Sequence, residues 1–207
     1  MTSLVRKMAF RFERRWNEKA LRARSVPAGE LLDELAGKSV AIVGNARSLQ
    51  ERSEGARIDG ADLVIRINRA PMPSAASHGS RTNWLALATS LDKAEADRIA
   101  PERILWMSHK RKRLPYWVAT RPGFFLYPLE AFEALKTTLG APPTTGAMMI
   151  DMVLKSDASE INLFGFDFFS SLSLTGSRTA AQVPHDFAAE KAWVETRAAG
   201  DVRLTIN

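Results

Sequence analysis

The stretch "KSVAIVG" at residues 38–44 decides the fold, because it is a short apolar run that ends in a glycine. Such a run is typical of a strand that is buried on both faces of a sheet. Comparable runs recur at 61–68, 83–89, 102–108, 123–128, 160–166 and 201–206. Segments with helical patterns lie between several of them, at 129–138, 144–156 and 185–198. This alternation predicts an α/β fold, in which a Rossmann-like, mostly parallel sheet has helices on both faces.

The whole chain has 207 residues, of which 45% are apolar, enough to form the core of one domain. We expect that domain to span 29–207, after a basic amphipathic helix and linker at 1–28. The chain has no cysteine, which excludes disulfides, a thiolate nucleophile and thiolate metal sites, and favours a cytoplasmic location. It also has no run of about 18 apolar residues, so no membrane-spanning helix is expected.

Positive charge is concentrated at the N-terminus. Residues 1–24 hold eight of the 29 Lys and Arg residues but only two of the 23 acidic residues, so the remainder of the chain is neutral. A nucleic-acid-binding domain would carry its basic residues across the folded face. The basic isoelectric point therefore belongs to the N-terminal segment, and we expect no nucleic-acid partner.

Residues 4–23 are predicted to form one helix, in which Val5, Met8, Phe12 and Trp16 share a face. Arginines and lysines fill most of the other faces. Such a helix can lie on an anionic bilayer with its apolar stripe inserted, or it can pack on the domain or on another subunit. The first alternative predicts a protein held peripherally on the inner face of the cytoplasmic membrane.

Polar residues follow the first two predicted strands, at the sheet edge where open α/β folds bind ligands. Gly44 allows a sharp turn, but a single glycine fits neither a dinucleotide-binding loop nor a P-loop. The second strand ends in "IRINRAP", in which Arg66 and Asn68 share one face. We expect Asn68 either to hydrogen-bond a ribose or phosphate, or to cap the turn before Pro71.

The segment "PPTTGAMMIDMVL" places two hydroxyls and a glycine, Thr144, Thr145 and Gly146, ahead of a predicted helix. Backbone N–H groups and the helix dipole at such a position favour an anion or the polar edge of a base. The alternative is a threonine that only caps the helix. The segment by itself does not decide between a binding role and a capping role.

Two charged loops are less specific. In "HGSRT", Arg81 could pair with an acid, a phosphate or Asp59, whereas His78 is expected to be a solvated or a turn residue rather than a ligand. The run "SHKRKRLPYW" at 108–117 could grip a phosphorylated lipid acceptor or a membrane surface, or it could be a solvated loop.

Together these segments resemble the sialyltransferases of glycosyltransferase family 29. The family's long motif resembles "VAIVGNARSL", "IDGADLVIRINRAP" and "HGSRT", which follow in that order over 40–82. Its short motif resembles "PPTTGAMMIDMVLKSDASEINLFGFDFF" at 142–169. Its last motif, H-x-x-x-x-E, resembles "HDFAAE" at 185–190. The absence of the cysteines that animal members carry fits a bacterial member of the family.

The resemblance implies a GT-A-variant-like fold that transfers a sialic-acid-like sugar, with inversion, from a CMP-activated donor to a glycan or lipid-linked glycan. The donor-binding residues that it implies are Gly44, Asn45, Ser48, Asn68, Thr144, Thr145, Gly146 and Gly165. The family's third motif, a histidine-aromatic pair, is missing, and "SSLSLTGSRTAAQ" occupies its interval. Arg178 or the serines are candidates to replace that histidine at the donor phosphate, and Arg81 is a further candidate.

An inverting displacement needs a base for the acceptor hydroxyl and a group that stabilises the departing phosphate. Histidine suits the first role near neutral pH, and the resemblance points to His185. The alternative is that His185 only starts the following helix. Asp186 could cap that helix, and Glu190 could pair with a neighbour or orient the loop. A CMP donor carries one phosphate and the chain has no D-x-D pair, so neither a metal ion nor a cofactor is expected.

Two other functions stay open at this point. The same site could use a different CMP-activated ulosonate, such as CMP-Kdo, because the shape of a sugar pocket decides between such donors. Alternatively, the chain could be a non-catalytic nucleotide-binding or scaffolding relative. The missing third motif favours this second alternative, whereas His185 in its motif favours an enzyme.

Overall fold

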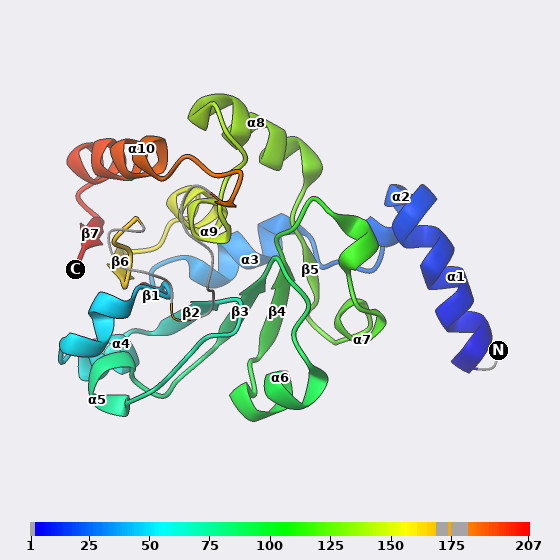
Figure 1. Cartoon of the computed structure of the whole chain (residues 1–207), viewed down its shortest axis with the longest axis horizontal. Coiled ribbons are helices and arrows are strands. Elements are labelled where there is room, and N and C mark those ends of the chain that lie inside the picture. The colour runs from blue at the N-terminus through cyan, green and yellow to red at the C-terminus, as the bar shows by residue number, and fades with distance from the viewer. Residues whose placement is uncertain (1–2, 169–173, 175–181) are drawn as a thin grey trace.

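The computed structural model describes residues 3–168, 174 and 182–207, and in this part of the chain seven parallel strands form one sheet (Figure 1). The strands are β1 Ser39–Val43, β2 Leu63–Ile67, β3 Trp84–Leu87, β4 Arg103–Trp106, β5 Phe125–Leu126, β6 Glu160–Phe164 and β7 Leu204–Ile206. Their order in the sheet is β5-β4-β3-β2-β1-β6-β7. The chain thus moves outward from β1 to β5, and then crosses back to place β6 on the other side of β1. Open α/β sheets bind their ligands where the strand order reverses in this way.

Helices cover both faces of the sheet, and the core lies in two layers. One layer holds buried side chains from β1–β6 together with those of α3 Ala28–Leu35, α8 Leu129–Leu139, α9 Thr145–Leu154 and α10 Phe187–Gly200. On the other face the strands pack against the 3-10 helix η1 Arg47–Glu51, α4 Gly55–Gly60, α6 Lys93–Ile99 and α7 Tyr116–Ala119. The remaining short elements are α5 Ala75–His78, which packs against α4, and the 3-10 helix η2 Arg111–Arg113. Because side chains alternate along a strand, Val40 and Ile42 face one layer while Ala41 and Val43 face the other.

The predicted α/β fold with a parallel sheet is confirmed. The run at 123–128 is a strand only over Phe125–Leu126, because Pro128 already caps α8. The run at 201–206 is a strand only over Leu204–Ile206. Within the described residues, no helix is both long enough and apolar enough to cross a bilayer.

The single helix predicted at 4–23 is wrong, because the chain breaks at Asn17. α1 spans Ser3–Trp16 and α2 spans Glu18–Arg22, and Asn17 between them leaves the helical region with φ −135° and ψ 76°. The Asn17 side chain accepts a hydrogen bond from the N–H of Ala20 at 3.0 Å, and so caps α2. The two helices pack on the domain at the end of the molecule where β5 and α7 lie (Figure 1).

Candidate active site

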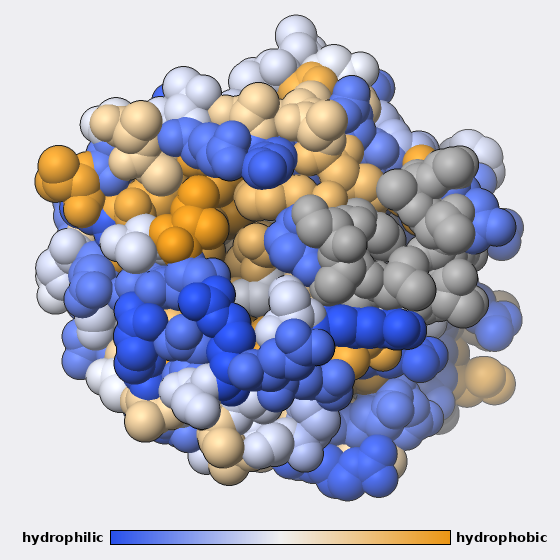
Figure 2. Space-filling model, turned by 60° about the vertical axis from the view of Figure 1, so that its left-hand side comes forward, coloured by the Kyte–Doolittle hydropathy of each residue, from blue (hydrophilic) through white to orange (hydrophobic). Residues whose placement is uncertain are grey.

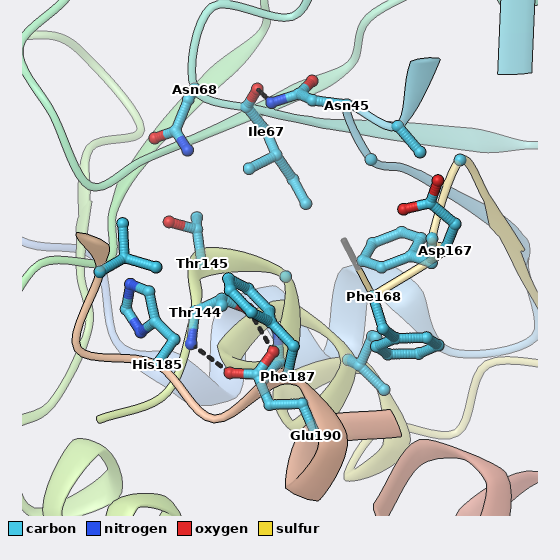
Figure 3. Close-up of a pocket in the computed structure, with 18 of the residues that line it drawn as sticks. Asn45, Ile67, Asn68, Thr144, Thr145, Asp167, Phe168, His185, Phe187 and Glu190 are labelled. Carbon is cyan, nitrogen blue, oxygen red and sulfur yellow. Dashed lines mark hydrogen bonds between the residues drawn. The ribbon is translucent and has the colours of Figure 1, made fainter. Parts of the chain in front are cut away.

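A cavity of about 680 Å³ lies where the strand order reverses, a size typical of small-molecule sites. Residues that directly follow β1, β2 and β6 line it, among them Gly44, Asn68 and Gly165. The start of α9 and the segment that leads into α10 line it as well (Figure 3). The parallel sheet therefore gathers motif residues that lie more than 100 positions apart in the sequence into one cavity.

Two glycines bring the ends of β1 and β6 together. The N–H of Gly44 donates to the carbonyl of Phe164 at 2.8 Å, and the N–H of Ala46 donates to the carbonyl of Gly165 at 3.2 Å. A Cβ atom on Gly44 would lie 2.4 Å from the Gly165 oxygen, and Gly165 itself has φ +67°. Larger residues would force the two turns apart. Gly44 and Gly165 thus line the cavity with closely packed backbone.

Asn45 and Asn68 line the cavity from the ends of β1 and β2 (Figure 3). The Asn45 amide donates through Nδ2 to the carbonyl of Ile67 at 3.2 Å, while its Oδ1 is buried and has no hydrogen-bond partner in the described part of the chain. Asn68 adopts a left-handed conformation, with φ 55°, and its Oδ1 accepts from the N–H of Ala88 at 2.9 Å. The bond to Ala88 fixes the Asn68 amide and leaves its Nδ2 for a ligand.

Thr144 joins the start of α9 to α10 through a buried carboxylate. The N–H of Thr144 donates to Glu190 Oε1 at 2.6 Å, and its hydroxyl donates to Glu190 Oε2 at 2.8 Å. The same hydroxyl accepts from the N–H of Ala147, so Thr144 also caps α9. Burial of Glu190 raises the pKa of its carboxyl to about 7, although the two bonds from Thr144 act in the opposite direction. Glu190 was expected to pair with a neighbouring group or to orient the loop, and the residue that it binds is Thr144 of the short motif.

His185 lies half-buried beside Thr144 and Thr145, just before α10 (Figure 3). Its Nδ1 lies 2.7 Å from the carbonyl oxygen of Pro142. Because a carbonyl can only accept, Nδ1 carries the proton, and a neutral ring then presents an unprotonated Nε2. Asp186, the next residue, accepts from the N–H of Ala189 at 2.9 Å and is the actual cap of α10. The capping role considered for this segment thus falls to Asp186, which leaves His185 free for another role.

Two of the predicted site residues that the structure describes do not line the cavity. Ser48 stands one step behind, where its hydroxyl donates to Asp167 Oδ2 at 3.2 Å and Asp167 itself lines the cavity. Arg81 precedes β3, so it lies at the amino-end edge of the sheet, where its Nη1 donates to the carbonyls of Asp59 and Ala61. Arg178 lies outside the described residues.

His78 is buried, with 0% of its surface exposed, so the solvated alternative is wrong, while its place at the end of α5 before Gly79 fits the turn alternative. Its Nδ1 lies 2.8 Å from the Ser77 hydroxyl. Burial and the charge of Arg66 lower the pKa of the imidazole, which keeps the ring neutral. This histidine belongs to a structural cluster outside the cavity.

The sequence analysis missed several cavity residues. Arg69 and Arg113 bring two guanidinium groups to the lining, and neither makes an ion pair with another described residue. Aromatic side chains complete the walls, namely Phe166, Phe168 and Phe187. Arg69 stands directly after Asn68 in the motif, which was a signal for its position, whereas nothing local separates Arg113 from the other basic residues around it.

The basic run at 108–117 is not wholly a solvated loop, and its contact with a phosphorylated lipid acceptor or a membrane surface stays a prediction. Arg111 is buried and forms an ion pair with Glu18 of α2 at 2.9 Å, while its Nη1 donates to the carbonyl of Ser108. Lys110 and Lys112 are exposed, and Arg113 reaches the cavity. Neighbours in this run therefore have three different environments.

The fold and cavity define the class of protein: an α/β protein with a cavity of small-molecule size at the strand-order reversal. Residues 17–103 match the model of glycosyltransferase family 29, the sialyltransferases. The match covers fewer than half of the residues, and it is to the same family that the sequence motifs resemble. No curated protein sequence matches the chain significantly.

Solved sialyltransferase structures have the same fold. A mammalian sialyltransferase superposes with a TM-score of 0.62 at 17% identity, over 100% of this chain and 86% of that one. The sialyltransferase CstII from Campylobacter jejuni, solved with cytidine-5'-monophosphate, gives a TM-score of 0.58 at 17% identity, over 83% of this chain and 80% of that one. A CstII structure with the substrate analogue CMP-3FNeuAc gives 0.53 at 18% identity, over 82% and 80%. The GT-A-variant-like fold predicted from the motifs is thus confirmed.

Proposed function

We propose that this protein transfers a sialic-acid-like sugar from a CMP-activated donor to a hydroxyl of a glycan or lipid-linked glycan, with inversion and without a metal ion. The observation that carries the proposal is the geometry of His185 in the cavity. Its Nδ1–H is bound to the carbonyl of Pro142, so Nε2 is the acceptor of the ring, and no described residue occupies it. We also propose that the protein acts in the cytoplasm. The absence of cysteine and the reaction with a CMP-sugar are both consistent with that location.

The polar lining suits a cytidine nucleotide. Asn45 Oδ1 is a buried acceptor that still needs a donor, and Asn68 Nδ2 is a donor held in place through its own Oδ1. The backbone N–H groups of Thr145 and Gly146 make no hydrogen bond with other described residues, and they open the first turn of α9. N–H groups at a helix start bind anions and polar base edges. These groups together offer donors and one acceptor to the nucleotide.

In the proposed reaction the acceptor hydroxyl attacks the anomeric carbon of the donor from the face opposite the phosphate. A carbon–oxygen bond forms to the acceptor, the bond from that carbon to the phosphate oxygen breaks, and CMP leaves with the bonding electrons. The hydroxyl proton passes to Nε2 of His185. Because Pro142 holds Nδ1–H, the imidazolium that forms keeps the orientation of the ring.

The departing phosphate needs positive charge, and the histidine of the family's third motif is absent. Arg69 and Arg113 both line the cavity without an acidic partner among the described residues. A CMP-ulosonate carries a phosphate and a carboxylate, so two guanidinium groups match its charge. We assign to Arg69 and Arg113 the electrostatic role that the missing histidine would have.

We base the proposed metal independence on the side chains that could ligate a metal ion. In the described part of the chain, no group of three or more His, Asp or Glu side chains is arranged to hold a metal ion. A donor with one phosphate can be held by arginines and N–H groups alone. Transfer in the presence of EDTA tests this directly, and a rate that returns only with added Mg²⁺ or Mn²⁺ would refute it.

The main test is release of CMP from CMP-sialic acid and CMP-Kdo, each with and without lipid-linked glycan. We expect acceptor-dependent release from one donor, and His185→Gln should lower kcat by about 10²–10⁴-fold, the usual contribution of a general base. His109→Gln is the matched control, because His109 is exposed, stacks on Phe132 with ring centroids 4.4 Å apart and lies outside the cavity. NMR of the product at the anomeric centre shows whether the configuration is inverted.

Each other outcome points to a specific error. Full turnover by His185→Gln would show that His185 is not the base. Release from CMP-Kdo but not from CMP-sialic acid would assign the alternative donor to the same site. Binding of CMP without turnover of any donor would favour the non-catalytic relative.

A further inference from the structure

The first helix carries a continuous apolar stripe that the domain leaves uncovered. Five of its side chains are exposed, by 68% at Leu4, 47% at Val5, 62% at Met8, 62% at Phe12 and 75% at Trp16. Elsewhere among the described residues, large exposed apolar side chains are only Val202 and Ile206 near the C-terminus. On the face turned forward in Figure 2, apolar residues are interspersed with hydrophilic ones. The concentration on α1 is therefore a specific feature of this helix.

The opposite side of α1 is fixed to the domain. Phe10 is 1% exposed and packs edge-on against Tyr116, with the ring centroids 5.3 Å apart. Arg14, one turn later, donates through Nη1 to the carbonyl of Leu114 at 2.9 Å. At 3.6 residues per turn, Phe10 lies about half a turn away from the centre of the apolar stripe. The domain thus holds α1 so that the stripe points away from it.

Most basic residues of α1 are also exposed and unpaired in the described part of the chain. Glu13 is the only acidic residue of the helix, and Arg24 already binds it at 2.7 and 3.0 Å. The exposed cations Arg6, Lys7, Arg11 and Arg15 form no ion pair with any described residue. An exposed apolar stripe flanked by unpaired basic residues is the pattern of a helix that lies in a lipid interface.

We propose that α1 docks the protein on an anionic lipid bilayer, with Met8, Phe12 and Trp16 inserted at the headgroup boundary and the flanking basic residues on the lipid phosphates. A second copy of the chain is a poor occupant, because a pair of α1 helices would bring like charges together. Anionic lipid satisfies both the stripe and the cations. The break at Asn17 ends this helix, and α2 turns inward to bury Leu21.

The docked helix is mechanically linked to the cavity. Glu18 of α2 forms an ion pair with Arg111, which donates through Nη2 to the carbonyl of Tyr127, and Arg113 of the same short helix lines the cavity. The cavity is therefore held at a fixed position relative to the bilayer. This consequence rests on the proposed function: acceptors carried on lipids would be presented to the site, and free glycans would not gain from docking.

Flotation of the full chain with vesicles tests the docking without any enzymatic assay. We expect binding to vesicles of phosphatidylcholine and phosphatidylglycerol, and little binding to phosphatidylcholine alone. The triple variant Met8→Ser, Phe12→Ser, Trp16→Ser should lose binding at least tenfold, while its thermal melting stays unchanged because these side chains are exposed. The control is Val202→Ser, which removes an even more exposed apolar residue far along the chain.

Charge is tested separately. Arg11→Gln with Arg15→Gln should weaken vesicle binding by roughly 25-fold, because each basic residue near an anionic surface contributes about fivefold. Lys136→Gln with Lys191→Gln, on α8 and α10, is the control with two exposed cations removed elsewhere. Vesicle binding that survives both the serine and the glutamine variants would overturn the proposal. So would a wild-type dimer that ignores vesicles and dissociates in the serine variant, because the stripe would then be an interface between copies.

Discussion

Two polar clusters flank β2, and the same motif supplies both. Arg66 belongs to the arginine cluster, formed by Asp59, Arg66, His78 and Arg81, of which Arg66 and His78 are buried and none lines the cavity. Its Nε donates to the carbonyl of Arg81 at 2.8 Å and its Nη2 to the carbonyl of His78 at 2.7 Å. Asn68, two residues later, lines the cavity and keeps Nδ2 available. Most polar groups of the arginine cluster bind one another, although Arg66 Nη1 and His78 Nε2 are buried without a hydrogen-bond partner in the described part of the chain. The cavity residues instead leave groups open toward the cavity.

Within one motif, Arg66 therefore has a structural role, whereas Asn68 is placed to bind a ligand. Arg66 is 1% exposed, and burial lowers the pKa of its guanidinium to about 10, although Asp59 acts in the opposite direction. It remains charged at neutral pH and fixes the loop that leads into β3. We therefore expect substitutions in the arginine cluster to reduce stability, and substitutions at His185 to reduce turnover. Substitutions at Thr144 and Glu190 should reduce both stability and turnover, because the hydrogen bonds between these residues join α9 to α10 at the cavity.

The largest effect on stability is expected for Arg66→Met. It removes the donor from three acceptors, the buried carbonyl of His78 and the part-buried carbonyl of Arg81 and hydroxyl of Thr82. An acceptor that is left buried without a donor costs about 1–3 kcal/mol. Urea unfolding measures the loss, with Arg98→Met on the exposed side of α6 as the control. Unchanged stability combined with lost turnover would assign Arg66 to the cavity and break the comparison.

Glu190 is expected to make the stability depend on pH. Its carboxyl pKa is raised from 4.5 to about 7 by burial, so the folded state holds the proton more tightly than the unfolded state. The resulting stabilisation is complete below about pH 4.5 and is lost as the pH rises to about 7, by up to about 3 kcal/mol. Unfolding of the wild type and of Glu190→Gln at several pH values measures this slope. A difference between the two proteins that does not vary with pH would contradict the raised pKa.

A smaller effect is expected for Thr144→Val, which removes the hydroxyl that caps α9 and binds Glu190. The loss of a cap and of one buried hydrogen bond costs about 1–2 kcal/mol. Turnover should fall too, because the wall beside His185 loosens. Thr144→Ser restores the hydroxyl and should recover both stability and turnover. Failure of serine to rescue would mean that the methyl group matters more than the hydrogen bonds.

The smallest effect is expected for Asp59→Asn. Burial acts to raise the pKa of the Asp59 carboxyl, but the N–H groups of Arg81 and Ser80 lower it overall. The stabilisation is therefore present above about pH 4 and is lost as the pH falls through the lower folded pKa. We expect a loss of about 1 kcal/mol at pH 7 and none at acid pH. Equal destabilisation at both pH values would show that shape, not charge, is what Asp59 contributes.

The elements of the fold could be predicted because their signals are local. Strand-length apolar runs and glycines after β1 and β6 identified the sheet and its ligand-binding edge. The motif order pointed to Asn45, Asn68, Thr144 and His185, all of which line the cavity. The break at Asn17 was also local in principle, since asparagine is a good helix cap, but a continuous apolar stripe outweighed it.

Other features depend on contacts that no local pattern contains. Ser48 misses the cavity because η1 turns it toward Asp167. In the run of basic residues at 110–113, Arg111 is buried and pairs with Glu18, whereas Arg113, two residues later in the same 3-10 helix, lines the cavity. Neighbouring residues of one type have different environments when separate elements pack on different sides of them.

The sequence by itself determined the α/β class, the parallel strands and the kind of chemistry, because periodicity and motif order are properties of the chain alone. Tertiary structure decided which side chains meet. It placed β6 beside β1, so that Gly44 and Gly165 touch, and it joined Thr144 to Glu190 across 46 positions. It also buried Phe10 and left the opposite stripe of α1 open. These outcomes depend on the packing of distant elements, which local sequence patterns do not encode.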